Sequence, residues 1–122
     1  MAVLKERGIR SNLTLVFSAS QALQAMRMGA AFVSPFIGWK ESNGEDSARF
    51  IEDVVAIRDN FGFETEIIVA AVRTGHQIVE SAAAGADIVT AGLAVLKDAF
   101  DHQYTAKGLK LFQDFWDQTR YE

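Results

Sequence analysis

The sequence contains no cysteine, a single proline (Pro35) and two histidines, His76 and His102, in 122 residues. Without cysteine the chain has no disulfide framework and no thiolate metal site. Two histidines are too few for the common histidine-based metal centres. We therefore expect no metal site.

The chain also lacks an excess of positive charge and any long apolar run. Its net charge of -4 and its pI of about 5.1 disfavour a nucleic-acid partner, which requires a basic face. The apolar stretches are too short to cross a membrane, and the segment from Met1 to Leu4 does not have the features of a signal peptide. We expect a cytoplasmic globular protein without a membrane partner.

Hydrophobic residues make up 49% of the chain, enough for the core of one domain, which we expect to span residues 1–122. Four glycines each follow a helix-like segment and precede a strand-like run, which is the usual place of a helix C-cap: Gly8, Gly29, Gly62 and Gly85. The runs are short and almost continuously apolar, as in buried parallel strands: Asn12–Phe17, Ala31–Ser34, Glu66–Val72 and Asp87–Thr90.

Helix-like segments separate and follow these runs: Ser20–Met28, Asp46–Phe61, Gly75–Ala84, Leu93–Phe100 and the amphipathic Thr105–Thr119. Alternating strands and helices predict a parallel α/β fold of four strands with flanking helices and a C-terminal helix. The acidic segment from Glu41 to Asp46 is predicted to be a solvated turn that caps the next helix. Gln21 is predicted to brace or cap the helix after the first strand.

Small polar residues interrupt the first strand. Asn12 and Thr14 are two positions apart, so they project from one face of the strand. Alone, this pattern also fits two side chains that the backbone satisfies near a strand end. Two further segments end apolar runs in the same way, Ser34–Gly38 and Ala70–Arg73.

These three segments together resemble the transaldolase family, which includes the fructose-6-phosphate aldolase-like sugar lyases. Its members are Schiff-base aldolases on a (β/α)8 barrel. The resemblance runs from about Gly8 to the C-terminus and covers the second half of that barrel. It implies a C-terminal half-barrel of a protein of sugar-phosphate and pentose phosphate metabolism, which transfers a dihydroxyacetone unit without a cofactor.

The resemblance also implies roles for individual residues. Thr14 and Asn12 match positions that hold the catalytic water and the substrate. Ser34 and Phe36 match the substrate pocket, and Arg73 matches a residue that binds the sugar phosphate. An arginine suits this role because its planar guanidinium donates two parallel hydrogen bonds to an anion.

Two positions depart from the family pattern. Trp39 stands where the family usually has a phosphate-binding arginine, and Ala71 stands where it usually has a serine. We therefore expect only weak binding of a sugar phosphate. Lys40 is expected to be a surface lysine, with a replacement for the missing charge as the alternative.

The lysine that forms the Schiff base in this family lies on an earlier strand, so we expect it to precede Met1. Two interpretations remain. The chain is either the C-terminal half of a transaldolase-type enzyme, or a catalytically inactive half-barrel that acts as an oligomeric structural or weak sugar- or anion-binding module. The apolar first and fourth strands would form open sheet edges. A second copy of the chain, an N-terminal half or a rearranged terminal helix would have to cover them, and a homo-oligomer is the simplest of these arrangements.

Overall fold

A computed structural model describes residues 1–119. In these residues the strands are β1 (Asn12–Val16), β2 (Phe32–Pro35), β3 (Glu66–Val72) and β4 (Ile88–Ala91). The helices are α1 (Ala2–Glu6), α2 (Ala19–Arg27), α3 (Gly38–Glu41), α4 (Ser47–Phe61), α5 (Gly75–Ala84), α6 (Leu93–Asp98) and α7 (Gln103–Gln118). The short helix α3 was not predicted from the sequence. The other boundaries agree with the prediction to within a few residues.

All pairings in the sheet are parallel, and the strands lie in the order β1-β2-β3-β4. Each strand therefore pairs with the next strand in the sequence, through a crossover that contains a helix. This arrangement confirms the predicted parallel α/β half of a (β/α)8 barrel. It also leaves β1 and β4 at the edges of the sheet, as expected.

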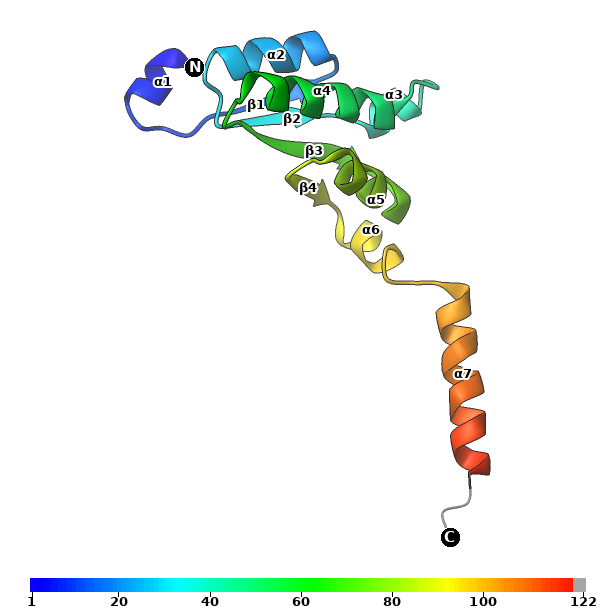
Figure 1. Cartoon of the computed structure of the whole chain (residues 1–122). Coiled ribbons are helices and arrows are strands. Elements are labelled where there is room, and N and C mark those ends of the chain that lie inside the picture. Colours follow the sequence, from blue (N-terminus) through cyan, green and yellow to red (C-terminus); the bar gives the residue numbers. More distant parts are fainter. Residues whose placement is uncertain (120–122) are drawn as a thin grey trace.

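The core lies between the sheet and the helices α2, α4 and α5, which pack side by side on one face (Figure 1). Val33, Val54 and Ile67 are each 0% exposed there. The opposite face of β1 carries Asn12 and Thr14, and both are exposed. One face of the sheet is thus packed and apolar, whereas the other is open and carries polar side chains.

Glycines end the helices where the sequence predicts them. Gly62 and Gly85 cap α4 and α5 with φ values of 63° and 92°. A residue with a Cβ is strained in this left-handed region, so glycine allows each helix to stop and the chain to turn back into the sheet.

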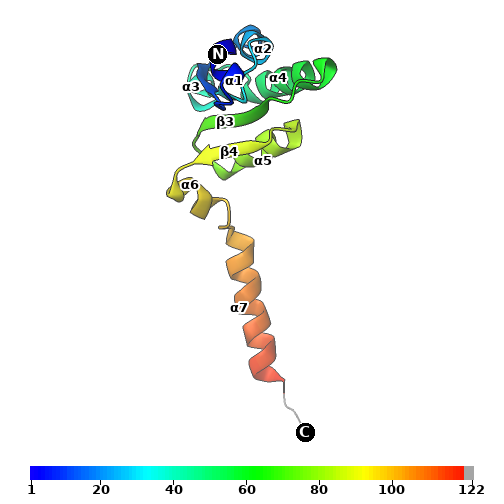
Figure 2. The same ribbon diagram turned by 90° about the vertical axis from the view of Figure 1, so that its left-hand side faces the viewer.

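The terminal helix α7 extends away from the rest of the molecule (Figures 1 and 2). None of its described residues is buried, and Leu109, Phe112 and Phe115 are well exposed. Within residues 1–119, no helix combines the length and the hydropathy needed to cross a bilayer.

Candidate functional site

The open face of the sheet brings two of the predicted site residues into contact. The hydroxyl of Ser34, on β2, donates a hydrogen bond of 3.0 Å to Oδ1 of Asn12, on β1. Ser34 is only 3% exposed, so Asn12 satisfies a buried hydroxyl. Asn12 is thus held by a side chain of the neighbouring strand. Asn12 is the first residue of β1, so this pair lies away from the carboxyl ends of the strands.

Thr14 lies on the same face, two residues further along β1, and is exposed. Its hydroxyl has no hydrogen-bond partner among the described residues, which leaves it available to a water molecule or a ligand. The assignment of Asn12, Thr14 and Ser34 to substrate and water binding stays a prediction.

The carboxyl ends of β1 and β3 share an unusual backbone conformation. Leu15 and Ala71 have φ values of 58° and 57°, although neither is glycine. The strand register shifts at both places, between Leu13 and Val16 and between Val69 and Val72. Such left-handed residues cost on the order of 1–3 kcal/mol and persist only where their surroundings hold them. The sequence gives no signal for either bulge.

A glutamine side chain holds the backbone just beyond each bulge. Oε1 of Gln21 accepts a hydrogen bond of 2.8 Å from the amide of Phe17. Oε1 of Gln77 accepts one of 2.6 Å from the amide of Arg73. The structure therefore confirms the predicted bracing role of Gln21 and shows the same device at Gln77, which sequence reasoning missed.

Arg73 follows β3, and its side chain lies against α3. Nη1 of Arg73 donates a hydrogen bond of 2.7 Å to the hydroxyl of Ser42. A Cβ on Gly38 would lie 2.2 Å from the carbonyl oxygen of Ala71 and 3.0 Å from Nε of Arg73. Only glycine allows α3 to approach so closely, so the end of β3 and the start of α3 form one unit.

Three aromatic rings gather beside this unit. Phe17 lies 5.6 Å from Trp39 and 5.7 Å from Phe36, and Phe36 and Trp39 meet edge to face at 6.0 Å between ring centroids. Trp39 is 52% exposed, so one part of its ring packs and the rest faces solvent. Phe36, predicted to line the substrate pocket, is thus in contact with Trp39, where the resemblance implies an arginine.

Lys40 is not the surface lysine that the sequence predicted. Its side chain is 14% exposed, and its Nζ donates to the carbonyl oxygen of Phe17 at 3.1 Å and pairs with Glu45. Nζ also lies 5.0 Å from the ring centroid of Phe50. The expectation was wrong because the ammonium group of Lys40 lies over this ring and also pairs with a carboxylate. A hollow of about 380 Å³ is lined by Phe17, Trp39, Lys40, Asn43 and Glu45.

The acidic segment from Glu41 to Asp46 is only partly the solvated turn that was predicted. Asp46 does cap α4, since it accepts a hydrogen bond of 2.9 Å from the amide of Arg49. Glu41, however, accepts hydrogen bonds from Gln77 and from Ser47. Its carboxylate therefore links three helices, a role that requires contacts between residues distant in the sequence.

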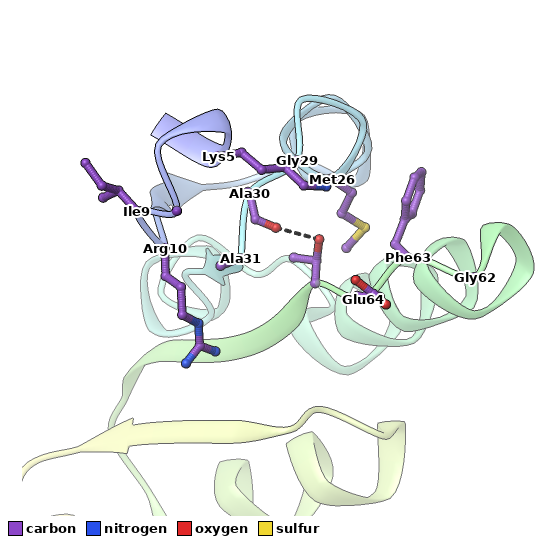
Figure 3. Close-up of a pocket in the computed structure, with 12 residues that line it drawn as sticks. Lys5, Ile9, Arg10, Met26, Gly29, Ala30, Ala31, Gly62, Phe63 and Glu64 are labelled. Carbon is purple, nitrogen blue, oxygen red and sulfur yellow. Dashed lines mark hydrogen bonds between the residues drawn. The ribbon is translucent and has the colours of Figure 1, made fainter. Parts of the chain in front are cut away.

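Another hollow, of about 550 Å³, lies at the amino ends of the strands (Figure 3). Lys5, Arg10 and Glu64 are among its lining residues. Barrel enzymes carry their chemistry at the carboxyl ends of the strands, so we do not place the site in this hollow.

A salt-bridge cluster also braces the amino ends of the strands. Arg58 pairs with Asp59 and Asp87, and Asp87 accepts a hydrogen bond of 2.8 Å from the amide of Ile67. The hydrogen bond with Asp59 is the main factor that raises the pKa of Arg58, so its charge persists at every practical pH. No three histidine, aspartate or glutamate side chains within residues 1–119 gather as a metal ion would need.

Comparison with known proteins matches residues 1–120 to the Transaldolase/Fructose-6-phosphate aldolase family. A 6-deoxy-6-sulfo-D-fructose transaldolase of Priestia megaterium is 55% identical over 94% of this chain and 51% of that protein. A probable transaldolase of Novosphingobium aromaticivorans is 47% identical over 95% of this chain and 54% of its own length. The chain thus spans about half the length of these curated relatives.

Among solved structures, mandelate oxidase matches with a TM-score of 0.51 at 19% identity, over 69% of this chain and 24% of the other. At this identity the match concerns the fold alone.

Proposed function

This chain belongs to the transaldolase/fructose-6-phosphate aldolase family, and we propose that it supplies the carboxyl-terminal half of a barrel that transfers a dihydroxyacetone unit from a ketose carrying a sulfonate at carbon 6. The observation that carries the proposal is that Trp39, where the resemblance implies a phosphate-binding arginine, stacks on Phe17 in the helix that Arg73 also contacts through Ser42.

Sulfonate and phosphate differ mainly in charge. A phosphate monoester carries about -1.5 to -2 charges at neutral pH, whereas a sulfonate carries one, and both present three acceptor oxygens. Lys40 adds little positive charge at this place because Glu45 pairs with it. With Trp39 and Ala71 in place of an arginine and a serine, the site offers one guanidinium, which matches a single negative charge.

The Priestia relatives support the same substrate class. They are named 6-deoxy-6-sulfo-D-fructose transaldolases and are 55% identical to this chain. The relatives named simply probable transaldolases are 43–48% identical over similar lengths.

In this function five residues of the chain have a defined task. Arg73 binds the sulfonate, and the exposed ring of Trp39 covers the end of the sugar that carries carbon 6. Asn12 and Ser34 bind sugar hydroxyls. A lysine outside this chain forms the imine with the ketose carbonyl and releases one water, and Thr14 is the catalytic residue that holds this water for the return step.

Calorimetric titration of the chain tests the substrate class. We expect 6-deoxy-6-sulfo-D-fructose to bind about tenfold more tightly than D-fructose 6-phosphate, because the second phosphate charge would be desolvated without a partner. Arg73→Ala should abolish binding of both. Arg49→Ala is the matched control, since Arg49 pairs on the surface of α4 with Asp53 at 3.1 Å. Tighter binding of the phosphate, or unchanged binding in a folded Arg73→Ala variant, would refute the proposal.

The inactive binding module is the second candidate, and the expectation that the imine-forming lysine precedes Met1 favours it. It predicts the same titration result. The two candidates differ once the remaining half of the barrel is supplied, because only the enzyme then forms a borohydride-trapped adduct with the ketose.

A further inference from the structure

We infer that Gln77 and Glu41 are positioning residues that hold Arg73 and the helix α3 together as one anion-binding unit. The inference rests on the proposed function, because it concerns the same cation. It gives a role to two residues that lie outside the predicted site.

Both the oxygen and the nitrogen of the Gln77 side-chain amide form hydrogen bonds within the protein. It is 4% exposed, and its Oε1 accepts hydrogen bonds from the amides of Arg73 at 2.6 Å and Thr74 at 3.2 Å. Its Nε2 donates to a carboxylate oxygen of Glu41. One buried side chain thus joins the backbone of Arg73 to the end of α3.

Glu41 continues this connection. Its other carboxylate oxygen accepts a hydrogen bond from Ser47, which begins α4 and is 4% exposed. Glu41 also belongs to the same short helix as Trp39. The ring that replaces the family arginine and the arginine that remains are therefore connected through Gln77 and Glu41.

The bulge at Ala71 explains why such a connection is needed. Its left-handed backbone is strained, and it lies two residues before Arg73. A four-residue helix such as α3 has little stability of its own. If the link between them is lost, the strained strand end and the short helix can relax apart, and the guanidinium of Arg73 is held less firmly against α3.

Gln21 provides an internal comparison. It makes the same hydrogen bond to the backbone after β1, at 2.8 Å from the amide of Phe17, but it is exposed and its described contacts include no carboxylate. Gln21 braces one strand end, whereas Gln77 joins a strand end to a second element. A substitution that preserves the accepting oxygen should therefore matter at Gln77 and not at Gln21.

Replacing the side-chain amide of Gln77 by a carboxylate separates its two roles, which are to accept hydrogen bonds from the backbone and to donate one to Glu41. In Gln77→Glu the carboxylate still accepts from the amides of Arg73 and Thr74, but it faces the carboxylate of Glu41. Adding Glu41→Gln restores the hydrogen bond in the opposite direction, because the new amide at position 41 donates to the new carboxylate at position 77. The double variant should therefore recover the lost function if Gln77 acts through this hydrogen bond, whereas no such recovery is expected if Gln77 only fills space.

The experiment combines calorimetric titration with 6-deoxy-6-sulfo-D-fructose and amide hydrogen exchange of Arg73 measured without ligand. We expect Gln77→Glu to weaken binding about tenfold and to speed exchange at Arg73. The double variant should bind within about threefold of the unchanged chain, and Gln21→Glu within about twofold.

Two results would overturn the inference: unchanged affinity in a folded Gln77→Glu chain, or a double variant as impaired as the single one. If Gln77→Glu does not fold, Glu41→Ala breaks the same link from α3 and should give the same tenfold loss. If the unchanged chain binds no sulfonate, the proposed function fails. The exchange rate at Arg73, compared between single and double variants, then still decides whether Gln77 positions this residue.

Discussion

Replacing Trp39 by arginine and Ala71 by serine should remove the preference of the anion site for sulfonate, so that sulfonate and phosphate bind about equally. The new guanidinium would start from α3, where Gly38 already lies against the side chain of Arg73. Two arginines could then share the oxygens of a phosphate, and each guanidinium can donate two parallel hydrogen bonds.

The magnitude follows from the hydrogen bonds that the two substitutions add and the ring packing that they remove. A charge-assisted hydrogen bond contributes about 1.5–3 kcal/mol and a neutral hydroxyl about 1 kcal/mol, so phosphate affinity should rise about one hundredfold, from millimolar to about ten micromolar. Without the packing of Trp39 on Phe17 and Phe36, the free energy of unfolding should fall by about 1–3 kcal/mol. Serine at position 71 adds little backbone strain, because alanine already has a φ of 57° there.

Calorimetric titration of both single variants and the double variant, at one ionic strength, measures the change for D-fructose 6-phosphate and 6-deoxy-6-sulfo-D-fructose. The sulfonate should gain only about tenfold, since its single charge is already matched by Arg73. Adding Arg73→Ala to the double variant is the control for the site itself. A folded double variant that binds phosphate no better than the unchanged chain would refute the assignment of Trp39 and Ala71 to the anion site.

Three other predictions concern catalysis, packing and assembly. The chain alone, incubated with D-fructose 6-phosphate and borohydride, should give no covalent adduct by mass spectrometry, and a stoichiometric adduct on any lysine would contradict the expected absence of the imine-forming residue. Gly38→Ala should lower the free energy of unfolding by at least about 2 kcal/mol, because its Cβ would lie 2.2 Å from the carbonyl oxygen of Ala71; the control Gly108→Ala, with nothing within 4 Å, should raise it by up to about 1 kcal/mol. Light scattering should show a homo-oligomer that Phe112→Asp weakens, since Phe112 is 70% exposed on α7; a stable monomer at micromolar concentration would argue against this.

The alternation of strands and helices was predictable because it depends on local signals. The almost continuously apolar run from Glu66 to Val72 gives β3 with its observed bounds, and the glycines at 62 and 85 mark the ends of α4 and α5. The open edges also followed from the sequence, since four βα units in the order of the chain leave the first and last strands unpaired on one side.

The site was less accessible to sequence reasoning. The hydrogen bond between Asn12 and Ser34 was not predicted, because it depends on the register of two neighbouring strands. Gln77 and Glu41 carry no local signal, because their hydrogen bond joins residues far apart in the chain. Lys40 was misassigned for the same reason: its environment depends on Phe50 and Glu45, which only the folded chain brings to it.

The sequential order of the sheet has a consequence for folding during synthesis. Asn12 pairs with Phe32, Phe32 with Glu66 and Ile68 with Ile88, so each new strand finds its partner in the part of the chain that has just left the ribosome. The sheet can therefore grow one βα unit at a time, without waiting for a distant segment. Throughout this growth the newest strand presents its unpaired edge, and within the described residues β4 retains such an edge. The same order that makes nascent folding simple thus leaves a surface on which further strands can add.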